Sequence, residues 1–191
     1  MNRAVAALLL VLAQALHGSP AGDAARRLVV EGAVGQVGRT VVYDGLYRRL
    51  AYPGGDLPVE RGSCTDVVIR AYRNAGIDLQ RLVHEEMVAA FADYPRQWGL
   101  SRPDANIDHR RVPNLAVFFR RQKASLRVTA DPRDYEPGDV VVWAIPTPHI
   151  GIVSDRKGEG RPLMIHNIGV GAVLEDVLFA YRVTDHFRFP A

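Results

Sequence analysis

The spacing of apolar residues divides the chain into a helical first part and a β-rich second part. Apolar positions recur at helical intervals over about residues 24–36, 63–74, 78–92 and 115–123. Short apolar or β-branched runs, separated by Gly, Pro and Asp, then follow at Val140–Trp143, Ile150–Val153, Leu163–Ile165 and about Val177–Val183. Runs of this kind are typical of antiparallel strands. Helices followed by a sheet predict an α+β domain.

Two stretches between these elements show no regular period. Residues 43–62 contain the turn-forming segment Tyr52–Asp56, and residues 94–113 are rich in Pro, Asp and Arg. Neither stretch has the low complexity of an interdomain linker, and no internal repeat is visible. We therefore expect one domain over residues 22–191.

The N-terminal residues have a different character from the rest of the chain. Arg3 precedes a short apolar run, Ala4–Leu12, which is far below the roughly 20 residues that span a bilayer. This pattern predicts a cleaved signal peptide over residues 1–21, with small residues that suit cleavage after Ala15 or after Ala21. We expect a periplasmic or secreted protein without a stable membrane anchor after cleavage. The alternative is the first helix of a cytoplasmic protein.

Composition and charge exclude several classes of protein. Among the 191 residues there is one cysteine, so the chain cannot close an internal disulfide. The formal net charge is +3, and the basic residues are scattered rather than gathered into a stripe. We therefore expect no nucleic-acid partner, and a monomer.

The single cysteine lies where a helix is expected to begin. Ser63, followed three residues later by Asp66, resembles a capping box and places Cys64 in the first turn. The positive end of the helix dipole there favours a thiolate, which is the nucleophilic form of cysteine. A small buried hydrophobe is the structural alternative for Cys64.

Two histidines on successive predicted strands supply a base. His149 begins the strand that follows the turn and strand Pro137–Trp143, and His166 ends the next strand. Antiparallel neighbours would hold the two imidazoles side by side, with His149 accepting the thiol proton and His166 orienting it. Asn167 is the alternative orienting residue.

The order of these segments resembles the NlpC-type cell-wall peptidases, which are circularly permuted relatives of papain. The resemblance rests on a cysteine-bearing helix, the Pro137–Val141 turn and strand, the strand His149–Val153 and a strand ending in His166. It implies a papain-like fold in which an N-terminal helical half carries the cysteine helix and packs on a C-terminal antiparallel sheet. It also implies Cys64 as nucleophile, His149 as base and His166 as orienting residue. The residues that flank Cys64 differ from the NlpC pattern.

A closer resemblance, to the bacterial domain-of-unknown-function family 1287, covers nearly the whole mature chain. It rests on Tyr52–Asp56, Cys64–Arg70, Asn106–Arg111 and Ile165–Gly169. These stretches supply the candidate substrate-binding residues, which are Tyr52, Asp56, Asp108, Arg110, Arg111 and Asn167. An arginine could clamp a substrate carboxylate and Asp108 could bind an amine, but the same cluster could equally tie a long loop to the core. Tyr52 could donate a hydrogen bond near the thiolate.

These residues predict an exported cysteine hydrolase that cleaves an amide through a thiol acyl-enzyme. Because peptidoglycan is the amide polymer available outside the cytoplasm, we expect a stem-peptide endopeptidase or amidase, with no metal or other cofactor. Two alternatives remain: a catalytically inactive cell-wall-binding module with the same fold, or a zinc hydrolase. A zinc site would draw on Asp108, His109, His149 and His166, although no metalloprotease motif joins them.

Overall fold

The computed structural model of the protein describes residues 19–191. The long helices all come before residue 122 and are α2 (Pro20–Val34), α3 (Cys64–Asn74), α4 (Leu79–Ala90) and α5 (Val112–Arg121). Short 3-10 turns are η1 (Phe91–Asp93), η2 (Asp108–Arg110) and η3 (Pro132–Asp134). Side-chain caps begin two of the helices: Ser19 accepts from the N–H of Gly22 at α2, and Asp78 accepts from that of Gln80 at α4.

The second part of the chain forms a six-stranded antiparallel sheet in the order β3-β8-β4-β5-β6-β7. Its strands are β3 (Ser125–Leu126), β4 (Val140–Ala144), β5 (His149–Lys157), β6 (Pro162–His166), β7 (Val173–Glu175) and β8 (Arg182–Phe187). A separate short parallel pair, β1 (Val42–Tyr43) with β2 (Arg61–Gly62), lies just before α3. Strands β4 to β7 are joined by local hairpins, whereas β8 returns to the far side of β4 and lies between β4 and β3.

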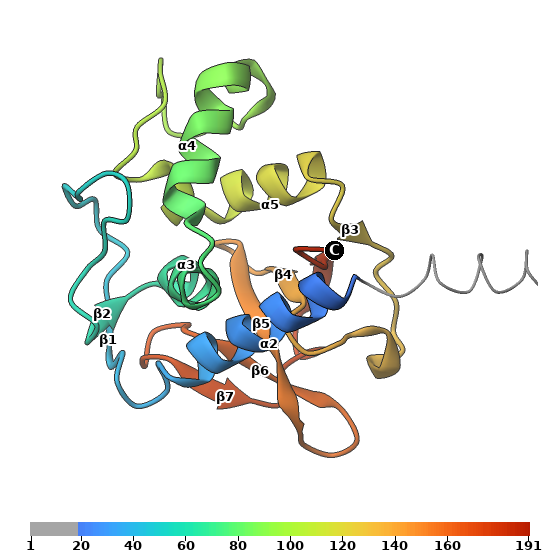
Figure 1. The fold of residues 1–191 in the computed structure, drawn as a ribbon. Coiled ribbons are helices and arrows are strands. Elements are labelled where there is room, and N and C mark those ends of the chain that lie inside the picture. The colour runs from blue at the N-terminus through green and yellow to red at the C-terminus, as the bar shows by residue number, and fades with distance from the viewer. Residues whose placement is uncertain (1–18) are drawn as a thin grey trace, which may run out of the picture.

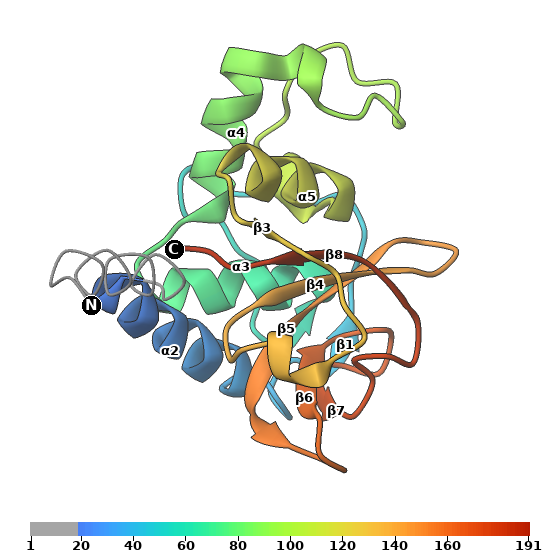
Figure 2. The ribbon, with the colours of Figure 1, turned by 90° about the vertical axis from the view of Figure 1, so that its right-hand side faces the viewer.

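Helix α3 lies at the centre of the molecule, with α4 and α5 on one side of it and the sheet on the other (Figures 1 and 2). It packs on α2, β5 and β6, and Val67, Val68 and Tyr72 are fully buried. Each buried aliphatic side chain of this kind contributes about 1.5–3 kcal/mol relative to an exposed one. The helix that begins at Cys64 is therefore one of the most firmly held elements in the fold.

A buried ionic cluster ties the start of β4 to the end of the sheet. Asp139 is fully buried and accepts hydrogen bonds from His186 Nε2 at 2.7 Å and Arg188 Nε at 2.7 Å. Gly138 just before it has φ +89° and packs so closely on the backbone of Arg26 that a Cβ would clash there. The Pro-Gly-Asp turn thus anchors β8 and the contact with α2.

The predicted α+β class is confirmed, with an N-terminal helical part that carries the cysteine helix and a C-terminal antiparallel sheet. All four predicted helices are present, and the first begins earlier than expected because Ser19 caps it. The prediction of a strand over 177–183 is wrong for most of its length, since the chain turns at residues 178–180 and β8 begins only at Arg182. Leu178 is buried there as part of a turn, which explains the apolar pattern.

The predicted signal peptide lies outside the described residues, apart from its last three positions. The second candidate cleavage position, after Ala21, falls inside the first turn of α2. Within residues 19–191, none of the helices has the length and apolar character needed to cross a membrane.

Candidate active site

The first turn of α3 places Cys64 at the start of the helix, as the sequence predicts. The Asp66 carboxylate accepts a hydrogen bond from the N–H of Ser63 at 2.7 Å, which is the carboxylate half of a capping box. Gly62 is required by this turn, because a Cβ there would lie 2.9 Å from Asp66 Cβ. The glycine serves close packing against α3 rather than approach to a ligand.

The Cys64 thiol is nearly buried, with 5% of the residue exposed. Burial raises the pKa of the thiol to about 11, although backbone N–H groups of Ile150, Thr65 and Cys64 itself favour the thiolate. The expected stabilisation at the helix start is therefore outweighed by burial, and the resting thiol is neutral. The hydrogen bond from the backbone N–H of Ile150 places the Cys64 sulfur against the start of β5. His149 is the residue before Ile150 and the first residue of that strand.

Three side chains on β5, β6 and β7 form a hydrogen-bonded row. His149 Nε2 lies 3.0 Å from His166 Nδ1, and His166 Nε2 lies 3.1 Å from Glu175 Oε2. Both imidazoles are buried, whereas the Glu175 side chain is 46% exposed. Burial lowers the pKa of both histidines, to about 3 for His149, so both rings are neutral at pH 7.

A tryptophan holds this row in place. Trp143 lies directly opposite His149 in the β4–β5 register, and the two rings stack with centroids 5.6 Å apart. The indole also donates a hydrogen bond to the carbonyl of Leu178 at 2.9 Å. Gly151 makes room for it, because a Cβ there would come within 3.0 Å of the indole ring. Trp143 thus shields the bond between the two histidines from water.

Cys64 opens into a cavity of about 360 Å³. One wall is the loop with Tyr43 and Tyr47, and another comes from the irregular stretch 94–113. The residues lining it are Tyr43, Gly45, Tyr47, Ser63, Cys64, Thr65, Gln97, Trp98, Ile107, Arg110, Arg111, Val112, Pro113, Thr147 and Pro148. Its size falls within the range of small-molecule sites.

The two adjacent arginines at this cavity differ in their contacts. Arg110 is buried and pairs with the Asp66 carboxylate at 2.8 Å, and its other nitrogens donate to the carbonyls of Asp44 and Leu46. It therefore ties the Tyr43–Tyr47 wall to the start of α3. Arg111 makes no such bonds within residues 19–191, and its guanidinium lies over the Trp98 ring with Cζ 4.1 Å from the centroid.

Four of the predicted substrate-binding residues do not line this cavity. Tyr52 packs edge-on against His84, and Asp56 pairs with Arg70 at 2.9 Å, where it holds the loop before β2. Asp108 is fully buried, and its Oδ2 accepts from the N–H of Asp104 at 2.5 Å. The amine-binding role expected of Asp108 therefore has no support at this cavity.

Asn167 has a structural position beside the site. Its side chain is fully buried, donates to the carbonyl of Gly62 at 2.8 Å and accepts from the N–H groups of Gly169 and Gly171. His149 instead contacts His166. The His149 imidazole is hydrogen-bonded to His166, whereas Asn167 fixes the loop that precedes Cys64.

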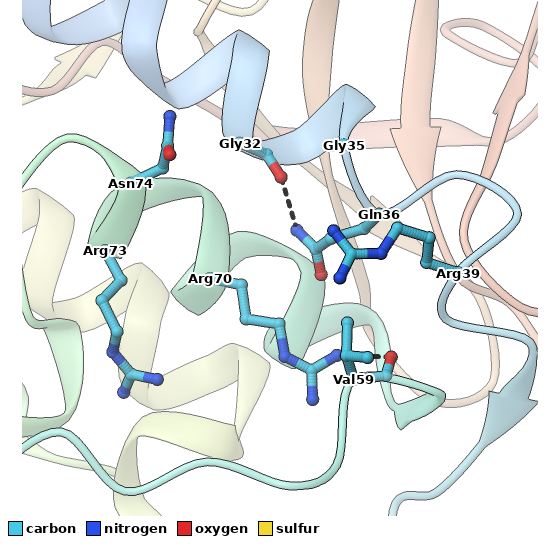
Figure 3. Close-up of a pocket in the computed structure, with 8 residues that line it drawn as sticks. All are labelled: Gly32, Gly35, Gln36, Arg39, Val59, Arg70, Arg73 and Asn74. Atoms are coloured by element: carbon cyan, nitrogen blue, oxygen red, sulfur yellow. Dashed lines mark hydrogen bonds between the residues drawn. The ribbon is translucent and has the colours of Figure 1, made fainter.

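A second cavity, of about 350 Å³, lies between α2 and α3 (Figure 3). Its residues are Gly32, Gly35, Gln36, Arg39, Val59, Arg70, Arg73 and Asn74. Two of its arginines are occupied, since Arg70 pairs with Asp56 and donates to the carbonyl of Arg61, while Arg73 pairs with Asp78. It contains no thiol, hydroxyl or imidazole that could act as a nucleophile or base.

The residues predicted as zinc ligands are not gathered around one point. Among residues 19–191, no group of three or more His, Cys, Asp or Glu side chains has the arrangement of a metal site. His109 is buried on η2, apart from the His149–His166 pair, and burial lowers its pKa to about 4.

Sequence reasoning missed four side chains of the site: Tyr43, Trp98, Trp143 and Glu175. Tyr43 is close enough to Cys64 for the thiolate to raise the pKa of its phenol, although burial is the larger cause. Trp143 ends the predicted strand that directly precedes His149, so its place opposite His149 could have been deduced from a hairpin between the two strands. Tyr43, Trp98 and Glu175 lie in loops or in very short strands. Such segments show no periodic pattern of apolar residues from which a position could be predicted.

Comparison with known proteins identifies a family but no activity. The model of a domain of unknown function (DUF1287) matches residues 30–189. A protein of Escherichia coli (strain K12), "Uncharacterized protein YijF", is 52% identical over 164 residues, covering 84% of this chain and 80% of that protein. The solved structure of NlpC1 from Trichomonas vaginalis is similar at 15% identity and a TM-score of 0.42. That alignment covers 91% of this chain, which spans only 46% of the other.

Proposed function

This chain belongs to the DUF1287 family, and we propose that it is an exported cysteine hydrolase that cleaves an amide bond. The proposal is supported by the hydrogen-bonded row His149–His166–Glu175 together with Cys64, whose sulfur lies at a cavity and against the backbone N–H of Ile150, the residue after His149. Burial lowers the pKa of both histidines, and groups with strongly shifted pKa values cluster at functional sites.

The hydrogen bonds of the row indicate which nitrogen of His149 would act as the base. The Glu175 carboxylate only accepts, so His166 Nε2 carries the proton of that bond. His166 Nδ1 therefore accepts, and His149 Nε2 donates to it. In the neutral ring this leaves the lone pair of His149 on Nδ1, the nitrogen available to a thiol. His166 and Glu175 are thus positioning residues, as in other nucleophile–base–orienter groups.

The reaction then runs through a thioester. As Cys64 Sγ bonds to the amide carbon, its proton passes to His149 Nδ1, and the charge on the carbonyl oxygen is stabilised by N–H groups in the first turn of α3. The C–N bond breaks when His149 returns that proton to the leaving nitrogen. Water, deprotonated by the same imidazole, hydrolyses the thioester and releases a carboxylic acid and free Cys64.

Peptidoglycan stem peptides are the substrate that we propose, because the N-terminal residues resemble a signal peptide and the wall is the amide polymer outside the cytoplasm. The competing function is a cell-wall-binding module that no longer catalyses. In that case Cys64 would be only a small buried residue, and the ordered histidine row would have no use.

Digestion of purified sacculi tests the proposal. Wild type, Cys64→Ser and Cys64→Ala would be incubated with sacculi, and the released fragments identified by mass spectrometry. We expect fragments from the wild type alone, with new ends that identify the bond. Sacculi that are bound but left intact by the wild type would favour the binding module. If Cys64→Ala digested the sacculi at the wild-type rate, Cys64 could not be the nucleophile and the thiol mechanism would be excluded.

A further inference from the structure

We propose that Arg111, held on the face of Trp98, binds a carboxylate of the substrate beside the amide that Cys64 attacks. Arg111, Trp98 and Cys64 all line the same cavity. This inference deepens the proposed function and rests on it, since it takes that cavity to be the substrate site.

The charges around the cavity favour an anionic ligand. Its lining includes two charged residues of the described chain, Arg110 and Arg111, and both are cationic. The charge of Arg110 is offset by the buried Asp66 carboxylate, 2.8 Å away. Arg111 is therefore the source of uncompensated charge at the cavity.

The Arg111 guanidinium has a hydrogen-bond donor that no protein group in residues 19–191 satisfies. Its Nη1 is shut off from solvent and has no hydrogen-bond partner, which is a costly state for a charged group. Asp108 and Asp104 lie near enough to favour its charge, yet neither forms an ion pair with it and neither lines this cavity. A ligand that accepts from the guanidinium would complete its hydrogen bonding.

Stacking on Trp98 makes the group selective for a planar anion. The centroid of the indole ring lies 4.1 Å from Cζ, and this cation–π contact holds the guanidinium in place. A fixed edge with parallel N–H groups matches the two oxygens of a carboxylate. A lysine at this place would keep the charge but lose that match.

Two peptides that differ in one group test the inference. The probes are Ala–γ-D-Glu–Lys, with a free α-carboxylate, and its D-isoglutamine counterpart, in which that carboxylate is an amide. We expect wild type to cleave the acid with a kcat/KM about 10- to 100-fold higher than the amide. Arg111→Gln should lose most of this preference by slowing the acid alone, and Arg111→Lys should keep part of it.

A matched control separates binding from folding. Arg96 lies in the same irregular stretch and is also placed over an aromatic ring, that of Phe91 at 5.6 Å, but it does not line the cavity. Arg96→Gln should leave the preference unchanged. Equal losses for both peptides in Arg111→Gln, or a wild type that cleaves acid and amide equally well, would overturn the inference.

Binding to an inactive variant keeps this result apart from the proposed function. If wild type cleaves neither peptide, the proposed reaction on these substrates fails, and the same peptides are then titrated into Cys64→Ala with isothermal titration calorimetry as the readout. Tighter binding of the acid, lost in Cys64→Ala/Arg111→Gln, would still support the carboxylate site. Equal affinity for both peptides, or no binding of either, would overturn it.

Discussion

His149 Nε2 and His166 Nδ1 lie 3.0 Å apart, so one histidine fixes the proton of the other. The pair is possible because β5 and β6 are adjacent antiparallel strands, with Ile152 opposite Ile165. Glu175 on β7 completes the row at His166 Nε2. The orientation of the base is therefore a property of three neighbouring strands rather than of either histidine alone.

Replacing the orienting residues should lower activity to different extents. We expect His166→Ala to reduce kcat by roughly 10²- to 10⁴-fold, because His149 is then free to adopt the wrong tautomer. Glu175→Gln keeps an oxygen that can accept from His166, and it removes a negative charge that is half-exposed to solvent. We therefore expect kcat to fall by no more than about 5-fold. Steady-state kinetics would measure both.

The control for Glu175 is Glu159→Gln, at an exposed position in the turn between β5 and β6. It should leave kcat unchanged. If His166→Ala were as active as wild type, the orienting role of His166 would have to be abandoned.

The pH profile should lack an acid limb near the ordinary histidine pKa. Cys64 and His149 begin as a neutral pair, because burial raises the thiol pKa to about 11 and lowers that of the imidazole to about 3. Neither group changes its charge between about pH 5 and 9, so kcat/KM should be nearly flat there. Initial rates across this range check the expectation. An acid limb centred near pH 6.5 would show that His149 titrates as an ordinary imidazole, which would contradict a buried base with a lowered pKa.

Stability should fall as the pH drops below the ordinary histidine pKa. His149 and His109 have folded-state pKa values lowered to about 3 and 4, so between those values and about 6.5 the unfolded chain binds more protons. By linkage each group makes unfolding easier on acidification, with a slope of up to about 1.4 kcal/mol per pH unit.

Urea unfolding at pH 7 and pH 5 would measure this difference. His109→Asn, which removes one of the two groups, should have a shallower dependence than wild type. Equal stability of the wild-type protein at the two pH values would contradict the neutral burial of both rings.

Asp139 should matter for folding and not for chemistry. Asp139→Ala leaves Arg188 and His186 without their buried partner, which typically costs about 3–5 kcal/mol. Asp134→Ala, in the exposed η3 turn, is the matched control and should cost far less. Thermal unfolding would show the difference, while kcat per folded molecule stays the same in both. A loss of kcat in folded Asp139→Ala would place this cluster in the catalytic path.

The sequence by itself determined the helices, most of the strands, and the positions of Cys64, His149 and His166 on these elements. Ser63 and Asp66 predict the start of α3 because capping is a local interaction between residues three apart. His149 and His166 follow from strand periodicity and from the pairing of consecutive strands. These features depend on neighbours in the chain, which is why a pattern of residue types reveals them.

Only the tertiary structure decided the rest of the site. Arg110 and Arg111 are adjacent and chemically identical, yet their contacts differ. Arg110 forms a buried ion pair with Asp66, whereas Arg111 lies over the Trp98 ring at the cavity. Likewise, burial reversed the expected effect of the helix start on the Cys64 thiol. Partners that are distant in sequence, and exclusion of water, set these properties. Neither is encoded in local spacing, so the irregular stretch 94–113 acquired its role only once it folded against α3.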